Sequence, residues 1–206
     1  MTPSPSSSPP PSRTFAYLLL TLTVLFWSGN WVVGRWIRDD VPPIALSFWR
    51  WVIAFACLLP WAWPQLRRQW RETLAHWRVL AMLGLFGGAC HNALTYTGLA
   101  HTTATNGVLL ASATPIMIIG LSWALFGKRL RPLEWLGVMV SLAGIVAIVA
   151  QGDLTRLLEL RPNAGDLWVL AAMLFWALYT VLLARRPPEL HALSFLAAVT
   201  LWGLAG

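Results

Sequence analysis

The chain has 206 residues, of which 57% are hydrophobic and 11% charged. A soluble domain carries about 25% charged residues, so this composition excludes an ordinary water-soluble globular protein. The net charge of +7 does not indicate nucleic-acid binding, because every Lys and Arg except Arg50 lies in a tail or a connection between apolar segments.

The first 14 residues, "MTPSPSSSPPPSRT", are rich in Pro and Ser. Such a segment is too polar to pack, and we expect residues 1–14 to form a disordered tail. The apolar run that follows is long for the core of a signal peptide and lacks a clear small-residue cleavage site. It is therefore predicted to remain as the first membrane span.

Six apolar runs are long enough to cross a hydrocarbon core of about 30 Å. They cover about residues 15–34, 44–63, 79–100, 104–126, 133–150 and 166–184. A seventh run begins near residue 190 and is still apolar at Gly206. The sequence therefore predicts an all-α polytopic membrane protein embedded in a lipid bilayer.

The positive charges alternate between the two sides of the predicted spans. Ten Lys and Arg residues fall on the side of the N-terminus and four on the opposite side. Cytoplasmic loops are enriched in Lys and Arg. We therefore expect a multi-pass protein of the cell inner (plasma) membrane with a cytoplasmic N-terminus.

Two short segments recur along the chain. "LFW" occurs at 25–27 and again at 174–176, and "ALSF" occurs at 45–48 and again at 192–195, with offsets of 149 and 147. These matches suggest that spans 6 and 7 repeat spans 1 and 2 in the opposite orientation, because five spans separate the copies. Inverted repeats are typical of secondary transporters. A complete second copy needs three more spans, so the chain is either a fragment or a half-length protein.

Segments along most of the chain resemble the EamA family of the drug/metabolite transporter superfamily. The matching segments are "LFWSGNWVVGR" (25–35), "PPIALSFWRWVIA" (42–54), "NALTYTGLAHTTATNGVLLASATPIMI" (92–118), "LEWLGVMVSLAGIVAIV" (133–149) and "AGDLWVLAAMLFWALYTVLLAR" (164–185). The resemblance implies ten helices in two inverted five-helix repeats, with a central cavity that moves small metabolites, often outward. One departure is that Lys128 follows Gly127, where the family usually has Gly-Glu.

The resemblance divides the chain into four parts. Residues 1–14 form the tail, 15–150 the first five-helix repeat, 151–165 a connecting loop, and 166–206 the truncated start of a second repeat.

Arg50 is the one charged residue in the stretch "IALSFWRWVIAFACLL". A charge inside a span is costly and usually faces a cavity or a partner. In one interpretation Arg50 extends to the outer headgroups between the interface anchors Trp49 and Trp51. In the other it faces the central cavity and binds a carboxylate or phosphate of the substrate. The family resemblance, with an arginine at this place, favours the cavity.

Small and polar residues form a stripe along span 3. Gly84, Gly88, Asn92 and Tyr96 recur every four residues, and His91 runs beside them. Close helix packing is one explanation, with Asn92 bonding a neighbouring helix. The other is that His91, Asn92 and Tyr96 contact substrate, and that His91 couples transport to protons.

Pro115 lies near the middle of span 4. Proline removes a hydrogen bond and disrupts the carbonyl four residues back, at Ala111. A kink that helps packing is one interpretation. The other is a hinge, or backbone that lines the cavity.

Spans 1 and 6 each carry aromatic and polar residues, which include Trp27, Asn30, Trp176 and Tyr179. If the repeat holds, Trp27 and Trp176 are equivalent and could form an apolar or cation-binding wall of one cavity. With 14 Trp in the chain, interface or lipid contact is the alternative.

Taken together, the residues predict transport of a small metabolite, amino acid-like or drug-like solute by alternating access, with efflux as the expected direction. We expect no catalytic residues, no metal site and no cofactor. The rival functions are an accessory or inactive half-transporter, completed by a second copy or a partner, and an intramembrane enzyme. The enzyme is disfavoured because no catalytic motif accompanies His91.

Overall fold

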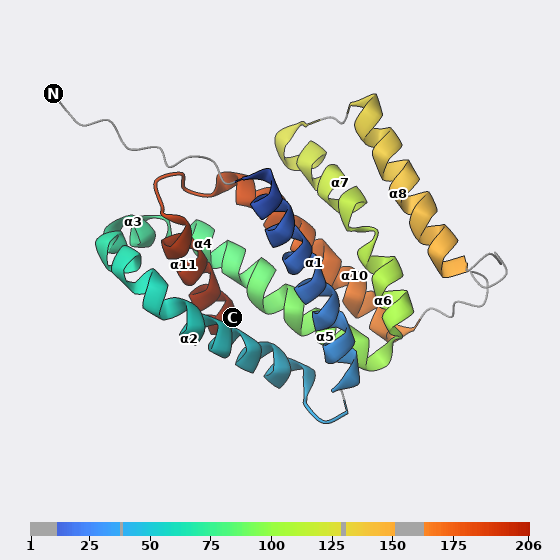
Figure 1. Ribbon diagram of the computed structural model, residues 1–206, viewed down its shortest axis with the longest axis horizontal. Coiled ribbons are helices and arrows are strands. Elements are labelled where there is room, and N and C mark those ends of the chain that lie inside the picture. Colours follow the sequence, from blue (N-terminus) through green and yellow to red (C-terminus); the bar gives the residue numbers. More distant parts are fainter. Residues whose placement is uncertain (1–11, 38, 129–130, 151–162) are drawn as a thin grey trace.

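A computed structural model describes residues 12–37, 39–128, 131–150 and 163–206. Every regular element within these ranges is a helix, as predicted (Figure 1). The elements are α1 (Arg13–Trp36), α2 (Pro43–Arg68), α3 (Trp70–Ala75), α4 (Trp77–Leu83), the π-helix η1 (Gly84–Cys90), α5 (His91–His101), α6 (Ala104–Ala111), α7 (Thr114–Phe126), α8 (Pro132–Ala150), α10 (Ala164–Leu182), the 3₁₀ turn η2 (Leu183–Arg185) and α11 (Ala192–Ala205).

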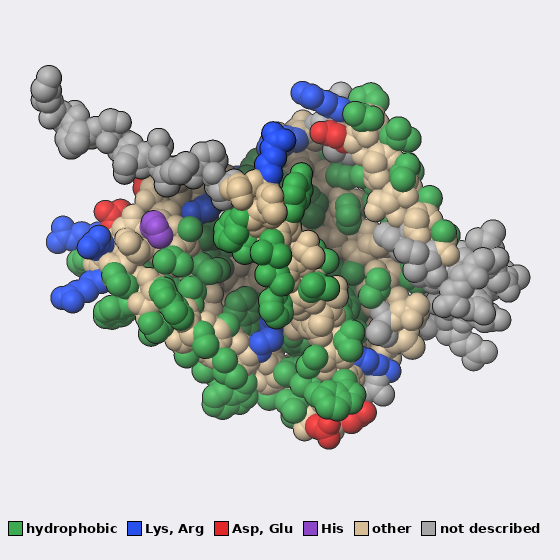
Figure 2. Space-filling model, in the orientation of Figure 1, with side chains coloured by type: hydrophobic (Ala, Val, Ile, Leu, Met, Phe, Trp, Pro, Cys, Tyr) green, Lys and Arg blue, Asp and Glu red, His purple; other side chains and the backbone are tan. Residues whose placement is uncertain are grey.

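Five helical stretches of the described chain are long and apolar enough to cross a membrane. They are Arg13–Trp36, Pro43–Arg68, Trp77–His101, Thr105–Phe126 and Ala164–Arg185, which match predicted spans 1 to 4 and 6. Predicted spans 5 and 7 are also helical, but their described apolar lengths, Pro132–Gly144 and Ala192–Ala205, are shorter. Figure 2 shows hydrophobic side chains over the sides of the helices, with most of the visible charged side chains toward their ends. This distribution is that of a multi-pass membrane protein.

Two helix starts differ slightly from the sequence-based boundaries. Helix α1 begins at Arg13, because the Ser12 hydroxyl accepts a hydrogen bond from the Phe15 amide and caps the helix. Residues 1–11 of the predicted disordered tail lie outside the described residues. Helix α10 begins at Ala164, after the N-cap Asn163, and the loop predicted before it lies outside the description over 151–162.

The third span is the centre of the structure. It is built from α4, η1 and α5, and its closest neighbour is α10. Gly98 and Gly165 allow this approach, since a β-carbon at Gly98 would lie 2.6 Å from Val169 Cγ2, and one at Gly165 would lie 2.7 Å from the Gly98 carbonyl oxygen. A buried hydrogen-bond network fixes the same pair of helices at one end. The Thr102 hydroxyl donates to the Asp166 carboxylate over 2.5 Å, and the backbone N–H of Asn163 donates to the same carboxylate over 2.9 Å.

The π-helix η1 also packs closely on its neighbours. A β-carbon at Gly84 would lie 2.5 Å from the Val199 carbonyl oxygen, and one at Gly87 would lie 2.5 Å from the Tyr179 ring. The glycines of this stripe therefore allow close helix packing, which is the first of the two explanations that the sequence suggests for them. No π-helix was predicted from the residues; the turns of such a helix are wider than those of an α-helix and are frequent at functional sites.

Candidate functional site

A cavity of about 470 Å³ lies between the helices at the level of η1. Residues from α1, α2, η1, α5, α7, α10 and α11 line it, together with Ala111 at the end of α6. Eight of the nine residues singled out in the sequence are among its lining residues: Trp27, Asn30, Arg50, His91, Asn92, Pro115, Trp176 and Tyr179. Residues from spans 1, 2, 3, 4 and 6 therefore meet around one space.

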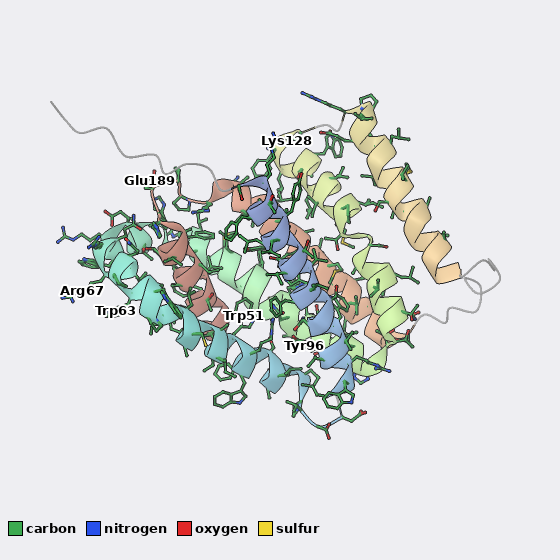
Figure 3. The ribbon with its side chains drawn as sticks, in the orientation of Figure 1. Trp51, Trp63, Arg67, Tyr96, Lys128 and Glu189 are labelled. Carbon is green, nitrogen blue, oxygen red and sulfur yellow. The ribbon has the colours of Figure 1, made fainter. Side chains whose placement is uncertain are left out.

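Arg50 faces the interior of the molecule. Arg50 is among the residues that line the cavity, and its Nη2 donates a hydrogen bond to the Asn92 Oδ1. It also lies over two aromatic rings, with Cζ 5.1 Å from the centre of the Trp51 ring and 5.7 Å from that of Tyr96. Figure 3 shows Trp51 and Tyr96 in the region where α2 approaches α5. This placement favours the cavity interpretation over the one in which Arg50 extends to the outer headgroups.

Asn92 has its side chain fixed by the backbone of η1. Its amide nitrogen donates to the carbonyl oxygens of Gly87 and Gly88, over 3.2 and 2.9 Å. Because both amide hydrogens point to carbonyls, the amide oxygen must point away from them, toward Arg50. The π-helix thus orients Asn92, and Asn92 orients the guanidinium.

Tyr96 is the one predicted site residue outside the cavity lining. Its side chain is only 3% exposed, and its hydroxyl donates to Asn30 Oδ1 over 2.5 Å. The Arg50 guanidinium lies over the Tyr96 ring, and the Tyr96 hydroxyl bonds to Asn30. Tyr96 therefore contacts two cavity residues without lining the cavity itself. The geometry indicates a supporting position for Tyr96.

An aromatic wall occupies another side of the cavity. The Trp27 and Trp176 rings meet edge to face at 5.3 Å, and Trp176 also lies 4.8 Å from His91 and 5.1 Å from Tyr179. His91 Nδ1 lies 3.0 Å from the Ala172 carbonyl oxygen. Since a carbonyl can only accept, this nitrogen carries the proton and donates. The bond ties His91 to α10 and turns its ring toward Trp176.

Span 4 is interrupted just before Pro115. Helix α6 ends at Ala111, and α7 starts at Thr114 with Pro115 in its first turn, where its missing N–H is tolerated. The Ala111 carbonyl, which the proline ring displaces, accepts a hydrogen bond of 2.6 Å from the Thr114 hydroxyl. The break brings Ala111, Thr114 and Pro115 to the cavity.

Charge in the cavity is one-sided. Among the described residues, Arg50, His91 and Tyr179 are the ionisable ones that line it, and no described Asp or Glu does so. Sequence reasoning missed Trp51, which it treated as an interface anchor, and the α11 residues Leu196, Val199 and Thr200. Trp51 adjoins Arg50 in the chain, and that adjacency was the available signal.

The fold and the cavity define a multi-pass helical membrane protein with an interior site lined by aromatic, apolar and polar side chains. The EamA-like transporter family matches residues 14–150, two thirds of the chain. The chain belongs to this family of membrane transporters.

Relatives agree with this assignment. An uncharacterized transporter of Archaeoglobus fulgidus is 30% identical over 81% of this chain and 56% of its own length. The uncharacterized transporters YyaM and YetK of Bacillus subtilis are each 25% identical, over 81% and 91% of this chain and 54% and 57% of their own lengths. The chain thus spans about half the length of the curated relatives that it matches. No solved structure matches the chain significantly.

Proposed function

We propose that this chain binds and transports a small organic anion, and that Arg50 holds the carboxylate or phosphate of this substrate. The placement of Arg50 carries the proposal. Arg50 lines the cavity and its guanidinium donates to a neutral amide, and within the described part of the chain no ion pair to it occurs. A charge away from water needs a compensating partner. An anionic substrate supplies one.

The composition of the cavity favours an anion over a cation. The described lining residues include no carboxylate, so an ammonium group would find no opposite charge there, only aromatic faces such as that of Trp176 and neutral polar groups such as that of Asn30. Arg50 would repel it. An amino acid-like solute is therefore a weaker candidate than an organic acid, whose apolar body the tryptophans accommodate.

Alternating access is the proposed mechanism, with spans 6 and 7 as the start of an inverted second repeat. Two contacts support the repeat. Trp27 and Trp176, which the repeat relates, pack together, and so do α2 and α11. The outward direction and the cytoplasmic N-terminus in the inner membrane remain proposals, based on the family resemblance and on the distribution of Lys and Arg.

A homodimer, or a complex with a partner chain that contributes to the cavity, is a further proposal for this chain, which spans about half the length of the relatives that it matches. Light scattering of the detergent-solubilised chain tests the first possibility. A particle with twice the protein mass of 22.9 kDa supports a homodimer. A particle with the mass of one chain contradicts it.

Uptake into liposomes tests the transport proposal. We expect the reconstituted chain to take up labelled benzoate faster than tetraethylammonium, and Arg50→Gln to reduce benzoate uptake at least tenfold. Arg13→Gln, at the start of α1, is the matched control and should leave uptake unchanged. Faster uptake of the cation, or benzoate uptake unaffected by Arg50→Gln, would contradict the proposal.

A further inference from the structure

Two buried hydrogen-bond donors at the cavity have no partner. Three buried side-chain polar atoms in the described part of the chain lack a hydrogen bond, and two of them are Arg50 Nε and Trp51 Nε1. The third, the Ser194 hydroxyl, belongs to a residue that does not line the cavity. Buried polar groups are nearly always paired in folded proteins. Two orphan donors on adjacent residues at one cavity therefore call for an explanation.

The two donors belong to side chains in contact. The Arg50 Cζ lies 5.1 Å from the centre of the Trp51 ring, and both residues line the cavity. Asn92 occupies Nη2 of the same guanidinium, so Nε is left over. An arginine Nε and an indole nitrogen can donate hydrogen bonds and cannot accept them. The group that completes this arrangement must therefore be an acceptor.

Resting on the proposed anion transport, we propose that Trp51 and Arg50 together form the oxyanion subsite of this cavity. The indole N–H and the Arg50 Nε–H donate to the oxygens of the substrate's carboxylate or phosphate. Two features make an anion the fitting acceptor. The positive charge of Arg50 strengthens its hydrogen bonds to an ionised group, and the lining residues that the structure describes hold no carboxylate that competes for either donor.

This subsite gives Trp51 a different role from that of the other cavity tryptophans. Trp27 and Trp176 pack against each other and offer apolar surface. Trp51 contributes one directed donor, so the cavity should discriminate a carboxylate from a neutral amide of the same shape. Benzoate and benzamide are such a pair.

Spectra of the chain labelled with ¹⁵N-tryptophan and held in detergent micelles test the subsite directly. The signal absent from Trp51→Phe identifies the Trp51 indole. We expect benzoate to shift this signal downfield in a saturable manner, and benzamide to leave it in place. Inorganic phosphate, titrated in the same way, distinguishes the two oxyanion classes: a shift with benzoate alone assigns a carboxylate, and a shift with phosphate alone assigns a phosphate.

Binding affinity provides the second readout. Trp51→Phe keeps an aromatic ring beside Arg50 and removes only the donor, so we expect it to weaken benzoate binding about tenfold. The matched control is Trp49→Phe, two residues away on α2, where the side chain is exposed and outside the cavity lining. It should change the affinity less than twofold.

The outcomes separate this inference from the proposed function. An unmoved Trp51 signal, with benzoate binding that Arg50→Gln abolishes, overturns the role of Trp51 and leaves the proposed function in place. An ordered water that satisfies the indole would give that result. Failure of both benzoate and phosphate to bind, or equal binding by Arg50→Gln, overturns both.

Discussion

Spans 1 and 3 have similar length and apolar character but opposite positions in the structure. Arg13–Trp36 is 24 residues long with mean hydropathy 1.5, and Trp77–His101 is 25 residues long with mean hydropathy 1.2. None of the first apolar window is buried inside the molecule, whereas 44% of the second is buried. Hydropathy therefore identifies a span without telling whether it faces lipid or protein.

The difference lies in the small and polar residues. Span 3 has glycines where α10 and α11 approach closely, and Asn92 where a buried amide is needed. In α1, a β-carbon at Gly29 would meet nothing within 4 Å. Without a hydrophobic driving force between helices in lipid, close packing and interhelical hydrogen bonds decide which helix is central. Gly84 in span 3 is therefore required for close packing, whereas Gly29 in span 1 is not.

The largest expected effect comes from enlarging a glycine in each span. Gly84→Leu should destabilise the protein by about 3 kcal/mol or more, because its β-carbon meets backbone and the Trp202 Cβ at 2.6 Å. Gly29→Leu should change the stability by less than about 0.5 kcal/mol or increase it slightly. Thermal unfolding in detergent measures both. Equal destabilisation by the two substitutions would break the comparison between spans 1 and 3.

A smaller effect is expected from the two acidic helix caps. Asp166→Ala should cost about 2 kcal/mol, because it leaves the Thr102 hydroxyl and the Asn163 amide without their acceptor. The matched change Glu134→Ala removes an exposed cap that accepts from the Arg131 amide over 2.7 Å, and should cost about 0.5 kcal/mol. The same unfolding measurement applies. Equal losses of stability from Glu134→Ala and Asp166→Ala would show that the network between α5 and α10 stabilises the protein no more than an exposed helix cap does.

The smallest effect distinguishes two threonines that bond to backbone carbonyls. Thr114→Val should cost about 1 kcal/mol, because the Ala111 carbonyl loses its bond at the interruption of span 4. Thr23→Val in α1 removes a similar bond, of 2.8 Å to the Leu19 carbonyl, on an exposed face inside a regular helix. It should change the stability by less than about 0.3 kcal/mol. A larger loss with Thr23→Val than with Thr114→Val would contradict this account of the break.

The sequence predicted the spans well, because the thickness of the hydrocarbon core sets the length of an apolar run. The acidic residues Glu134 and Asp166 act within one helix turn, since each carboxylate accepts from a backbone N–H three residues earlier. The sequence did not predict the π-helix at Gly84–Cys90, because that turn depends on the neighbours it packs against.

The candidate site was also predictable only in part, because some of its features depend on how the helices pack. Arg50 and Asn92 stand out because a polar residue in an apolar run needs a partner, and each is the partner of the other. Trp51 did not stand out, since an indole suits lipid headgroups and cavities equally well. Its orphan N–H becomes visible only when the surrounding helices are in place.

The central claim is that span 3 holds Arg50, through Asn92, in position to bind an anion. A double-mutant cycle on benzoate affinity tests it most directly, with Arg50→Gln, Asn92→Leu and the combined variant. We predict that Asn92→Leu weakens binding about tenfold in the wild-type background and has no further effect when Arg50 is replaced. Equal losses from Asn92→Leu in both backgrounds would contradict the claim.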